Sequence, residues 1–163
     1  MSDFDRFDQN APLRGVLIDT NLLVLLIVGS VNRDRIHGFK RTSDYSPADW
    51  DLLTGLLEKI PRRFATAHIL AEVSNLTDLR EPELETARDI LRNFISQIEE
   101  LAIPSSDACK STYYYRLGLT DAAIGLAAKQ RGCSVVTNDS DLYRALLEEG
   151  ASVIKFDHLR DML

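Results

Sequence analysis

Short apolar runs alternate with longer segments of helical periodicity along most of this chain. Five runs have the length and composition of strands, at 15–19, 63–66, 101–103, 134–137 and 152–154. The intervening segments predict helices through 22–26 and over 47–58, 67–79, 82–99, 121–130 and 140–149, with a short helix at the C-terminus. Strands that alternate with helices favour a parallel sheet covered on both faces. The sequence therefore predicts an α/β fold with a central, mostly parallel sheet.

The size and composition of the chain are those of one globular domain. It has 163 residues, of which 45% are hydrophobic and 27% are charged, enough to bury a single core. Residues 1–13 are expected to form a flexible leader and residues 14–163 a single domain. The longest apolar run, Leu22–Val28, is too short to cross a bilayer, and the acidic N-terminus does not resemble a signal peptide. Two cysteines without metal-ligand spacing indicate a reduced, cytoplasmic protein.

The charge is unevenly distributed. The formal net charge of −6 argues mildly against binding by phosphate neutralisation alone, although an enzyme can be acidic overall when its acids surround a bound metal. Segment 29–46, by contrast, carries an excess of basic residues. We interpret it as an insertion that forms a loop with a short helical piece. These basic residues either bind a nucleic-acid backbone or are ordinary solvent-exposed side chains. They are Arg33, Arg35, Lys40 and Arg41.

Four carboxylates occupy positions at the ends of predicted elements. Asp19 ends the first strand, Asp139 follows the fourth, and Asp121 opens a helix. In parallel sheets, ligands bind at the carboxyl ends of the strands, near a switch in strand order. Each aspartate, taken singly, is also explained as a helix cap or a favourable first-turn charge. Glu72 lies beside apolar helix positions, and a carboxylate near a core needs a partner.

Taken together, these carboxylates indicate a cation site. Several acids near one edge of a sheet repel one another unless a cation neutralises them. A set of ligands made of oxygen alone selects hard ions such as Mg²⁺ or Mn²⁺ rather than zinc. The expected cofactor is therefore Mg²⁺ or Mn²⁺.

Four segments that carry these acids resemble, in order, the four acidic motifs of PIN-domain proteins. They are Leu17–Leu22 (LIDTNL), Ala71–Leu76 (AEVSNL), Leu119–Ala123 (LTDAA) and Val136–Leu142 (VTNDSDL). The resemblance covers nearly the whole chain. Within the family, the chain resembles VapC-like toxin ribonucleases and related stand-alone PIN proteins. It implies a three-layer α/β/α sandwich, in agreement with the strand and helix pattern.

The resemblance also implies roles for individual residues. It implies a metal-binding and catalytic cluster of Asp19, Glu72, Asp121 and Asp139, with Asp141 as an accessory metal ligand. Asn21 would brace this cluster, and Thr137 would support its last member. The implied reaction is metal-dependent cleavage of RNA by in-line attack of water, which leaves a 5′-phosphate and a 3′-hydroxyl. Arg116 joins the basic residues of 29–46 as a candidate for RNA contact.

Several functional alternatives stay open. The same fold could serve as a non-catalytic scaffold that binds RNA or protein. Within the nuclease interpretation, the chain could be the toxin of a toxin–antitoxin pair, with an antitoxin protein as partner, or a free-standing RNA-processing enzyme. A homodimer is a further candidate assembly, and no membrane partner is expected. A response-regulator or haloacid-dehalogenase-like domain is disfavoured, because Asn21 stands two residues after Asp19 and no D-x-D-x-T motif occurs.

Overall fold

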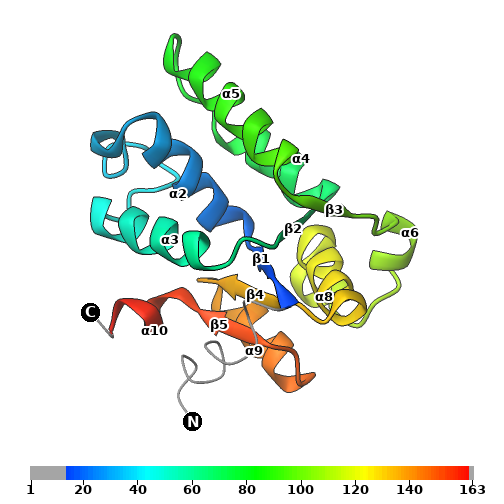
Figure 1. Cartoon of the computed structure of the whole chain (residues 1–163). Coiled ribbons are helices and arrows are strands. Elements are labelled where there is room, and N and C mark those ends of the chain that lie inside the picture. The colour runs from blue at the N-terminus through cyan, green and yellow to red at the C-terminus, as the bar shows by residue number, and fades with distance from the viewer. Residues whose placement is uncertain (1–13, 162–163) are drawn as a thin grey trace.

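A five-stranded sheet lies at the centre of the computed structural model, which describes residues 14–161 (Figure 1). The strands are β1 (Val16–Ile18), β2 (Arg63–Thr66), β3 (Glu99–Leu101), β4 (Ser134–Thr137) and β5 (Val153–Lys155). Their order across the sheet is β3-β2-β1-β4-β5, and every neighbouring pair is parallel. The expected parallel α/β fold is confirmed. The expected leader, 1–13, lies outside the described residues.

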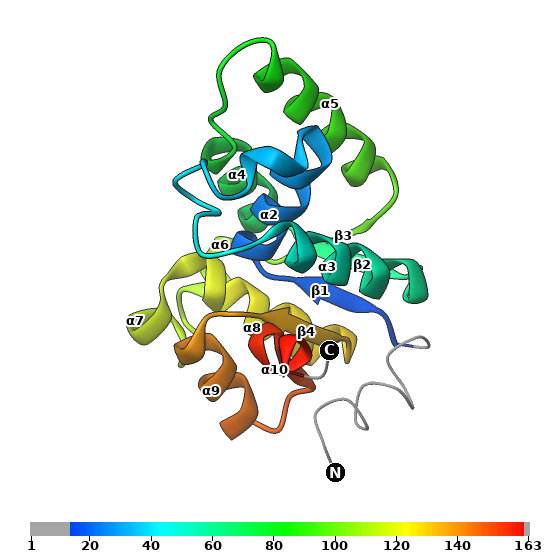
Figure 2. The same cartoon turned by 90° about the vertical axis from the view of Figure 1, so that its left-hand side faces the viewer.

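Helices pack on both sides of this sheet. The first group is α2 (Thr20–Val31), the 3₁₀ helix η1 (Arg33–Arg35), α3 (Pro47–Lys59), α4 (Ala67–Leu76) and α5 (Glu83–Ser96). The second group is α6 (Ser105–Ala108), α7 (Tyr114–Leu117), α8 (Leu119–Arg131), α9 (Ser140–Glu148) and α10 (Phe156–Arg160). In Figure 1, α2, α3 and α10 lie to the left of the strands and α6 and α8 to the right, and in Figure 2 α2–α5 lie together at the top of the view. This arrangement is the expected α/β/α sandwich. No helix among residues 14–161 is both long and apolar enough to span a bilayer.

The order of the strands reverses between β1 and β4. The chain adds β2 and β3 on one side of β1 and then places β4 and β5 on the other. Ile18 pairs with Val136, and the Asp19 amide donates to the Val136 carbonyl at 3.0 Å. The carboxyl ends of β1 and β4 are therefore adjacent, which is where parallel sheets bind ligands.

Helix α2 is longer than its apolar spacing predicts. It continues to Val31, so the expected loop 29–46 begins with the last turn of a helix. The reason is tertiary: the indole of Trp50 on α3 packs against Gly29, and its Nε1 donates to the Leu26 carbonyl at 3.1 Å. The absence of a side chain at Gly29 lets α3 approach α2 closely. The predicted short helical piece within 29–46 is confirmed as η1.

Three predicted boundaries are wrong. The third strand is Glu99–Leu101 rather than 101–103, because this edge strand is defined by its bonds to β2 and not by burial of its side chains. The helix before it accordingly ends at Ser96. Helix α8 begins at Leu119 after Gly118, whose φ of 87° lets the chain reverse directly from α7. Thr120 therefore lies inside the first turn of α8, although the sequence predicted that this helix begins at 121.

Replacing Gly29 with alanine should destabilise the protein. A Cβ at position 29 would overlap the Trp50 ring, and overpacking of this kind costs about 1–3 kcal/mol. Gly55 on α3 is the matched control, because a Cβ there meets no atom within 4 Å. Gly55→Ala should raise stability by up to about 1 kcal/mol through helix propensity. Urea unfolding measures both. Equal effects of the two substitutions would contradict the packing of α2 on α3.

Candidate active site

Asp19 lies at the junction of β1 and α2 and is only 5% exposed. Its Oδ1 accepts a hydrogen bond from the Thr20 amide, and its Oδ2 accepts one from the Thr137 hydroxyl, each at 2.6 Å. Burial raises the pKa of Asp19 to about 6. The two hydrogen bonds work against this rise, and the charges of Asp139 and Glu72 add to it. Asp19 caps α2, but the cap alone does not explain a carboxylate so far from water.

Asp139 stands at the carboxyl end of β4, beside Asp19. Its Oδ1 accepts from the amides of Asp141 and Leu142, each at 2.8 Å, and so caps α9. Its own amide donates to the Thr137 hydroxyl at 3.0 Å. The Thr137 hydroxyl therefore ties Asp139 to Asp19. The supporting role that the resemblance implied for Thr137 stays a prediction.

Asp121 completes an electrostatic group with these residues. It lies in the first turn of α8 and is partly buried. Burial raises the pKa of Asp121 to about 7, with further contributions from the charges of Asp19, Asp139 and Glu72. The fold therefore brings together all four carboxylates that the sequence singled out, from four separate elements.

Glu72 reaches the group from α4. Its side chain is exposed rather than at the buried face where the sequence placed it, and the Thr20 hydroxyl donates to its Oε2 at 3.3 Å. The sequence predicted that Glu72 needs a polar partner, and this partner is Thr20. Sequence reasoning missed this residue, although it stands between Asp19 and Asn21 in the first motif.

A hard divalent cation fits the chemistry of this group. No positively charged side chain is among the main contributors to the pKa of Asp19 or Asp121. Burial is the main cause of the two raised pKa values, and the charges of the neighbouring carboxylates add to it. Among residues 14–161, no three His, Cys, Asp or Glu side chains converge closely enough to ligate one ion as they stand. The donors are carboxylate oxygens, which suit Mg²⁺ or Mn²⁺.

Two residues implied by the resemblance make weaker connections. Asp141 is exposed in the first turn of α9, where its backbone amide binds Asp139. Asn21 is exposed in the first turn of α2, and within the described residues its side chain makes no hydrogen bond. The accessory role of Asp141 and the bracing role of Asn21 stay predictions.

Most of the candidate RNA-binding residues are paired with acids at the surface. The ion pairs are Arg33–Asp51 at 2.6 Å, Arg35–Glu83 and Lys40–Asp78 at 3.0 Å, and Arg116–Glu148 at 3.6 Å. The charge of Arg41 contributes to the lowered pKa of Asp78. Surface pairs of this kind contribute at most about 1 kcal/mol each and exchange readily with other anions. Their RNA contacts stay predictions.

Comparison with known proteins agrees with this geometry. The family model described as PIN domain matches residues 16–146. The chain belongs to the PIN-domain family. No curated protein matches the chain significantly. The matched region contains the four carboxylates and Asp141, and it ends before β5 and α10. The PIN domain gives the chain a nuclease-type fold and supports a hydrolase activity.

Two further residues of this PIN domain border the site and were missed in the sequence. The Asn138 Oδ1 accepts from the Asp157 amide at 3.2 Å. Burial raises the pKa of Tyr45, and the nearby Asn138 side chain works against this rise. The charge of Asp19 acts on Tyr45, which places the phenol near the carboxylates. Asn138 could have been found from its place in the fourth motif. Nothing in the sequence around Tyr45 marks it.

The raised pKa values predict how stability changes with pH. The folded-state pKa values of Asp19 and Asp121, about 6 and about 7, exceed the ordinary value of 3.8. The folded state therefore holds more protons than the unfolded state between about pH 4 and pH 7, and stability falls as pH rises through this window. In EDTA, Asp121→Asn should lose less stability than wild type from about pH 5 to pH 7.5.

Urea unfolding at the two pH values measures this difference. The exposed Asp34→Asn serves as the control, because it removes an equal charge from η1. Equal pH dependence in wild type and Asp121→Asn would contradict the electrostatic coupling of the four carboxylates.

Proposed function

We propose that this PIN domain is a Mg²⁺- or Mn²⁺-dependent endoribonuclease. The observation that carries the proposal is the electrostatic coupling of four carboxylates from β1, α4, α8 and the β4–α9 junction, with two of their pKa values raised to about 6 and about 7. Such a cluster is electrostatically unfavourable in the absence of a cation, so its presence supports a cation-dependent function. Asp19, Glu72, Asp121 and Asp139 would hold the ion or ions.

The chain's own residues fix the ligands in place. When bound, the cation supplies Lewis-acid chemistry: it acidifies water and neutralises charge that develops on the phosphate. Thr137 orients Asp19 and Asp139 through one hydroxyl. The Thr20 hydroxyl orients Glu72. Hydrogen bonds therefore orient Asp19, Glu72 and Asp139, and the carboxylates would have to move closer together to ligate one ion. In-line attack would leave a 5′-phosphate and a 3′-hydroxyl.

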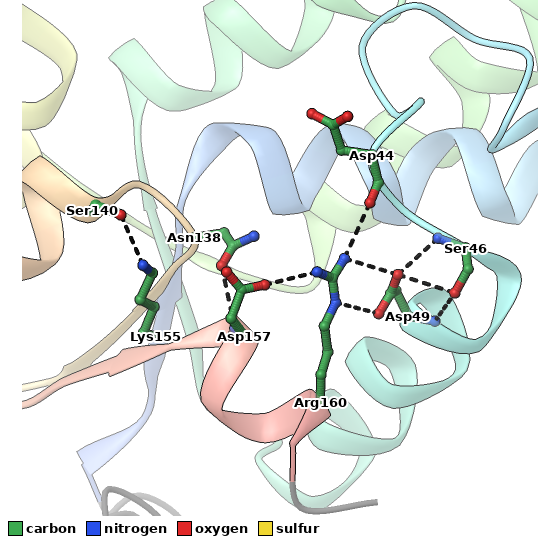
Figure 3. A network of polar contacts seen from close by, with 8 residues as sticks. All are labelled: Asp44, Ser46, Asp49, Asn138, Ser140, Lys155, Asp157 and Arg160. Carbon is green, nitrogen blue, oxygen red and sulfur yellow. Dashed lines mark hydrogen bonds and ion pairs between the residues drawn. The ribbon is translucent and has the colours of Figure 1, made fainter.

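Lys155 is the cation best placed to contact the RNA backbone. It ends β5, in register with Thr137 of β4, and its Nζ donates to the Ser140 hydroxyl at 2.8 Å (Figure 3). Among the described residues its ammonium has no carboxylate partner, in contrast to Arg33, Arg35 and Lys40. An ammonium bound to a neutral hydroxyl next to Asp139 is free to bind a phosphate adjacent to the scissile one.

The partners and location belong to the same proposal. RNA is the proposed substrate, and an antitoxin protein or a second copy of the chain is the proposed protein partner. The proposed compartment is the cytoplasm, on the evidence of two free cysteines, Cys109 and Cys133. The alternative of a non-catalytic scaffold predicts an intact fold that binds no Mn²⁺ in a titration.

Asp19→Asn should abolish metal-dependent cleavage. The amide is isosteric but removes the charge of the most buried ligand, so the rate on a mixed single-stranded RNA pool with Mn²⁺ should fall at least about a hundredfold. Asp89→Asn, at an exposed position of α5, should cut like wild type. Cleavage that survives unchanged in Asp19→Asn would sink the assignment of the cluster.

Lys155→Gln should weaken RNA binding in a salt-dependent way. Loss of one phosphate contact lowers the slope of log K against log salt by about 0.7 for a single strand. Fluorescence anisotropy with a labelled single-stranded RNA, in the cleavage-inactive Asp19→Asn background, measures this slope. Lys129→Gln, at the exposed C-terminal end of α8, is the control with the same change of charge. An equal slope for the two variants would refute a phosphate contact by Lys155.

A further inference from the structure

The side chain of Asn138 is held from two directions. Its Oδ1 accepts from the Asp157 amide at the start of α10, at 3.2 Å (Figure 3). Its side chain also lies near the hydroxyl of Tyr45, from the segment between α2 and α3, and favours the ionised phenol. Asn138 therefore joins two segments that are far apart in the sequence.

Asn138 is also the middle residue of the corner that carries Asp139. On one side of it, the Thr137 hydroxyl binds Asp19 at 2.6 Å. On the other side, the Asp139 amide returns to the same hydroxyl at 3.0 Å. A rotation of the Asn138 backbone would move both contacts, so the position of its side chain affects the spacing of two proposed metal ligands.

The ring of Tyr45 is itself held by an aromatic contact and a cation–π contact. It is 7% exposed, and its ring packs edge-on against Phe156 of α10, with 6.3 Å between ring centroids. The Arg160 guanidinium lies 5.2 Å from the centroid of the Tyr45 ring, within the range of a cation–π contact. The preceding turn is stabilised by the buried Thr42, whose hydroxyl donates to the Ile36 carbonyl at 2.7 Å.

Arg160 binds α10 to the start of α3. Its Nε and Nη2 donate to the two carboxylate oxygens of Asp49 at 2.7 and 3.0 Å, and its Nη1 donates to Asp157 at 2.7 Å (Figure 3). Nη2 also donates to the Asp44 carbonyl, next to Tyr45, at 3.3 Å. Burial favours a higher pKa for Asp49, but the bonds from Arg160 and Ser46 outweigh it and lower the pKa. The forked pair is thus ionised and only partly exposed.

We propose that Tyr45 and Arg160 are positioning residues of the candidate active site. Arg160 holds both Tyr45 and Asp157, these two residues position the Asn138 side chain, and Asn138 fixes the Thr137–Asp139 corner in the geometry that the proposed metal-binding carboxylates need. The inference rests on the proposed metal-dependent function. It gives the 29–46 segment a role inside the protein as well as at its surface. Arg160 lies beyond the region of the family match, 16–146, and Tyr45 lies between the first two motifs, so both act on Asn138 of the fourth motif from outside the shared motifs.

Tyr45→Phe tests the proposal, because it removes only the hydroxyl and keeps the ring against Phe156 and Arg160. Loss of a group that orients a metal ligand typically weakens metal binding about 10-fold or more. We expect that loss for Mn²⁺, measured by calorimetric titration of the full chain. Tyr115→Phe loses the same atom from a ring that is 95% exposed and should bind Mn²⁺ like wild type. Thermal unfolding of both variants separates metal affinity from global stability.

A double-mutant cycle tests whether Tyr45 acts through Asn138. If it does, adding Tyr45→Phe to Asn138→Ala should weaken Mn²⁺ binding little further. Additive losses, or wild-type affinity in Tyr45→Phe, would overturn the proposal. Wild-type protein that binds no Mn²⁺ would overturn it together with the proposed function. If wild type binds Mn²⁺ but cuts no RNA, while Tyr45→Phe binds Mn²⁺ weakly, the nuclease proposal fails and the positioning role stands.

Discussion

The buried charge of Asp19 is the constraint around which this end of the molecule is organised. A carboxylate that is 5% exposed needs hydrogen bonds to each oxygen, and it receives them from Thr20 and Thr137. The second bond can form only because β4 lies directly beside β1. The reversal in strand order that places these strands together therefore also creates the site. The Thr137 hydroxyl thus connects the order of the strands to the position of Asp19 in the candidate site.

The same cluster lowers the stability of the metal-free protein at neutral pH, although the proposed function needs it. Without a cation, Asp19 and Asp121 ionise only at about pH 6 and pH 7, because burial and neighbouring acids disfavour their charged forms. Evolution of a simple scaffold would remove such a cluster, since isosteric amides would relieve the repulsion. The proposed divalent cation would turn the repulsion into ligation. The acidic net charge of −6 would then be compatible with the proposed nucleic-acid substrate, because the cation would neutralise part of it at the site.

The four carboxylates could be singled out from the sequence because their signals are local. Asp19 and Asp139 each follow an apolar strand, and parallel strands bring such positions to one edge whatever the details of packing. Thr20, Tyr45 and Asn138 were missed because their roles depend on contacts between distant segments. The boundary errors have the same origin: Trp50 extends α2 past Gly29, and Gly118 starts α8 before Thr120. The basic residues of 29–46 were identified from composition, which does not reveal that Arg33, Arg35 and Lys40 each have an acidic partner.

The most direct test of the account is the anomalous scattering of Mn²⁺ in crystals of the full chain soaked with the ion at neutral pH. The account predicts a peak at the carboxyl edge between β1 and β4, about 2.0–2.2 Å from an oxygen of Asp19 and from oxygens of the neighbouring carboxylates. A peak confined to other surface acids, or an empty edge at saturating Mn²⁺, would contradict the claim that these carboxylates form a metal centre.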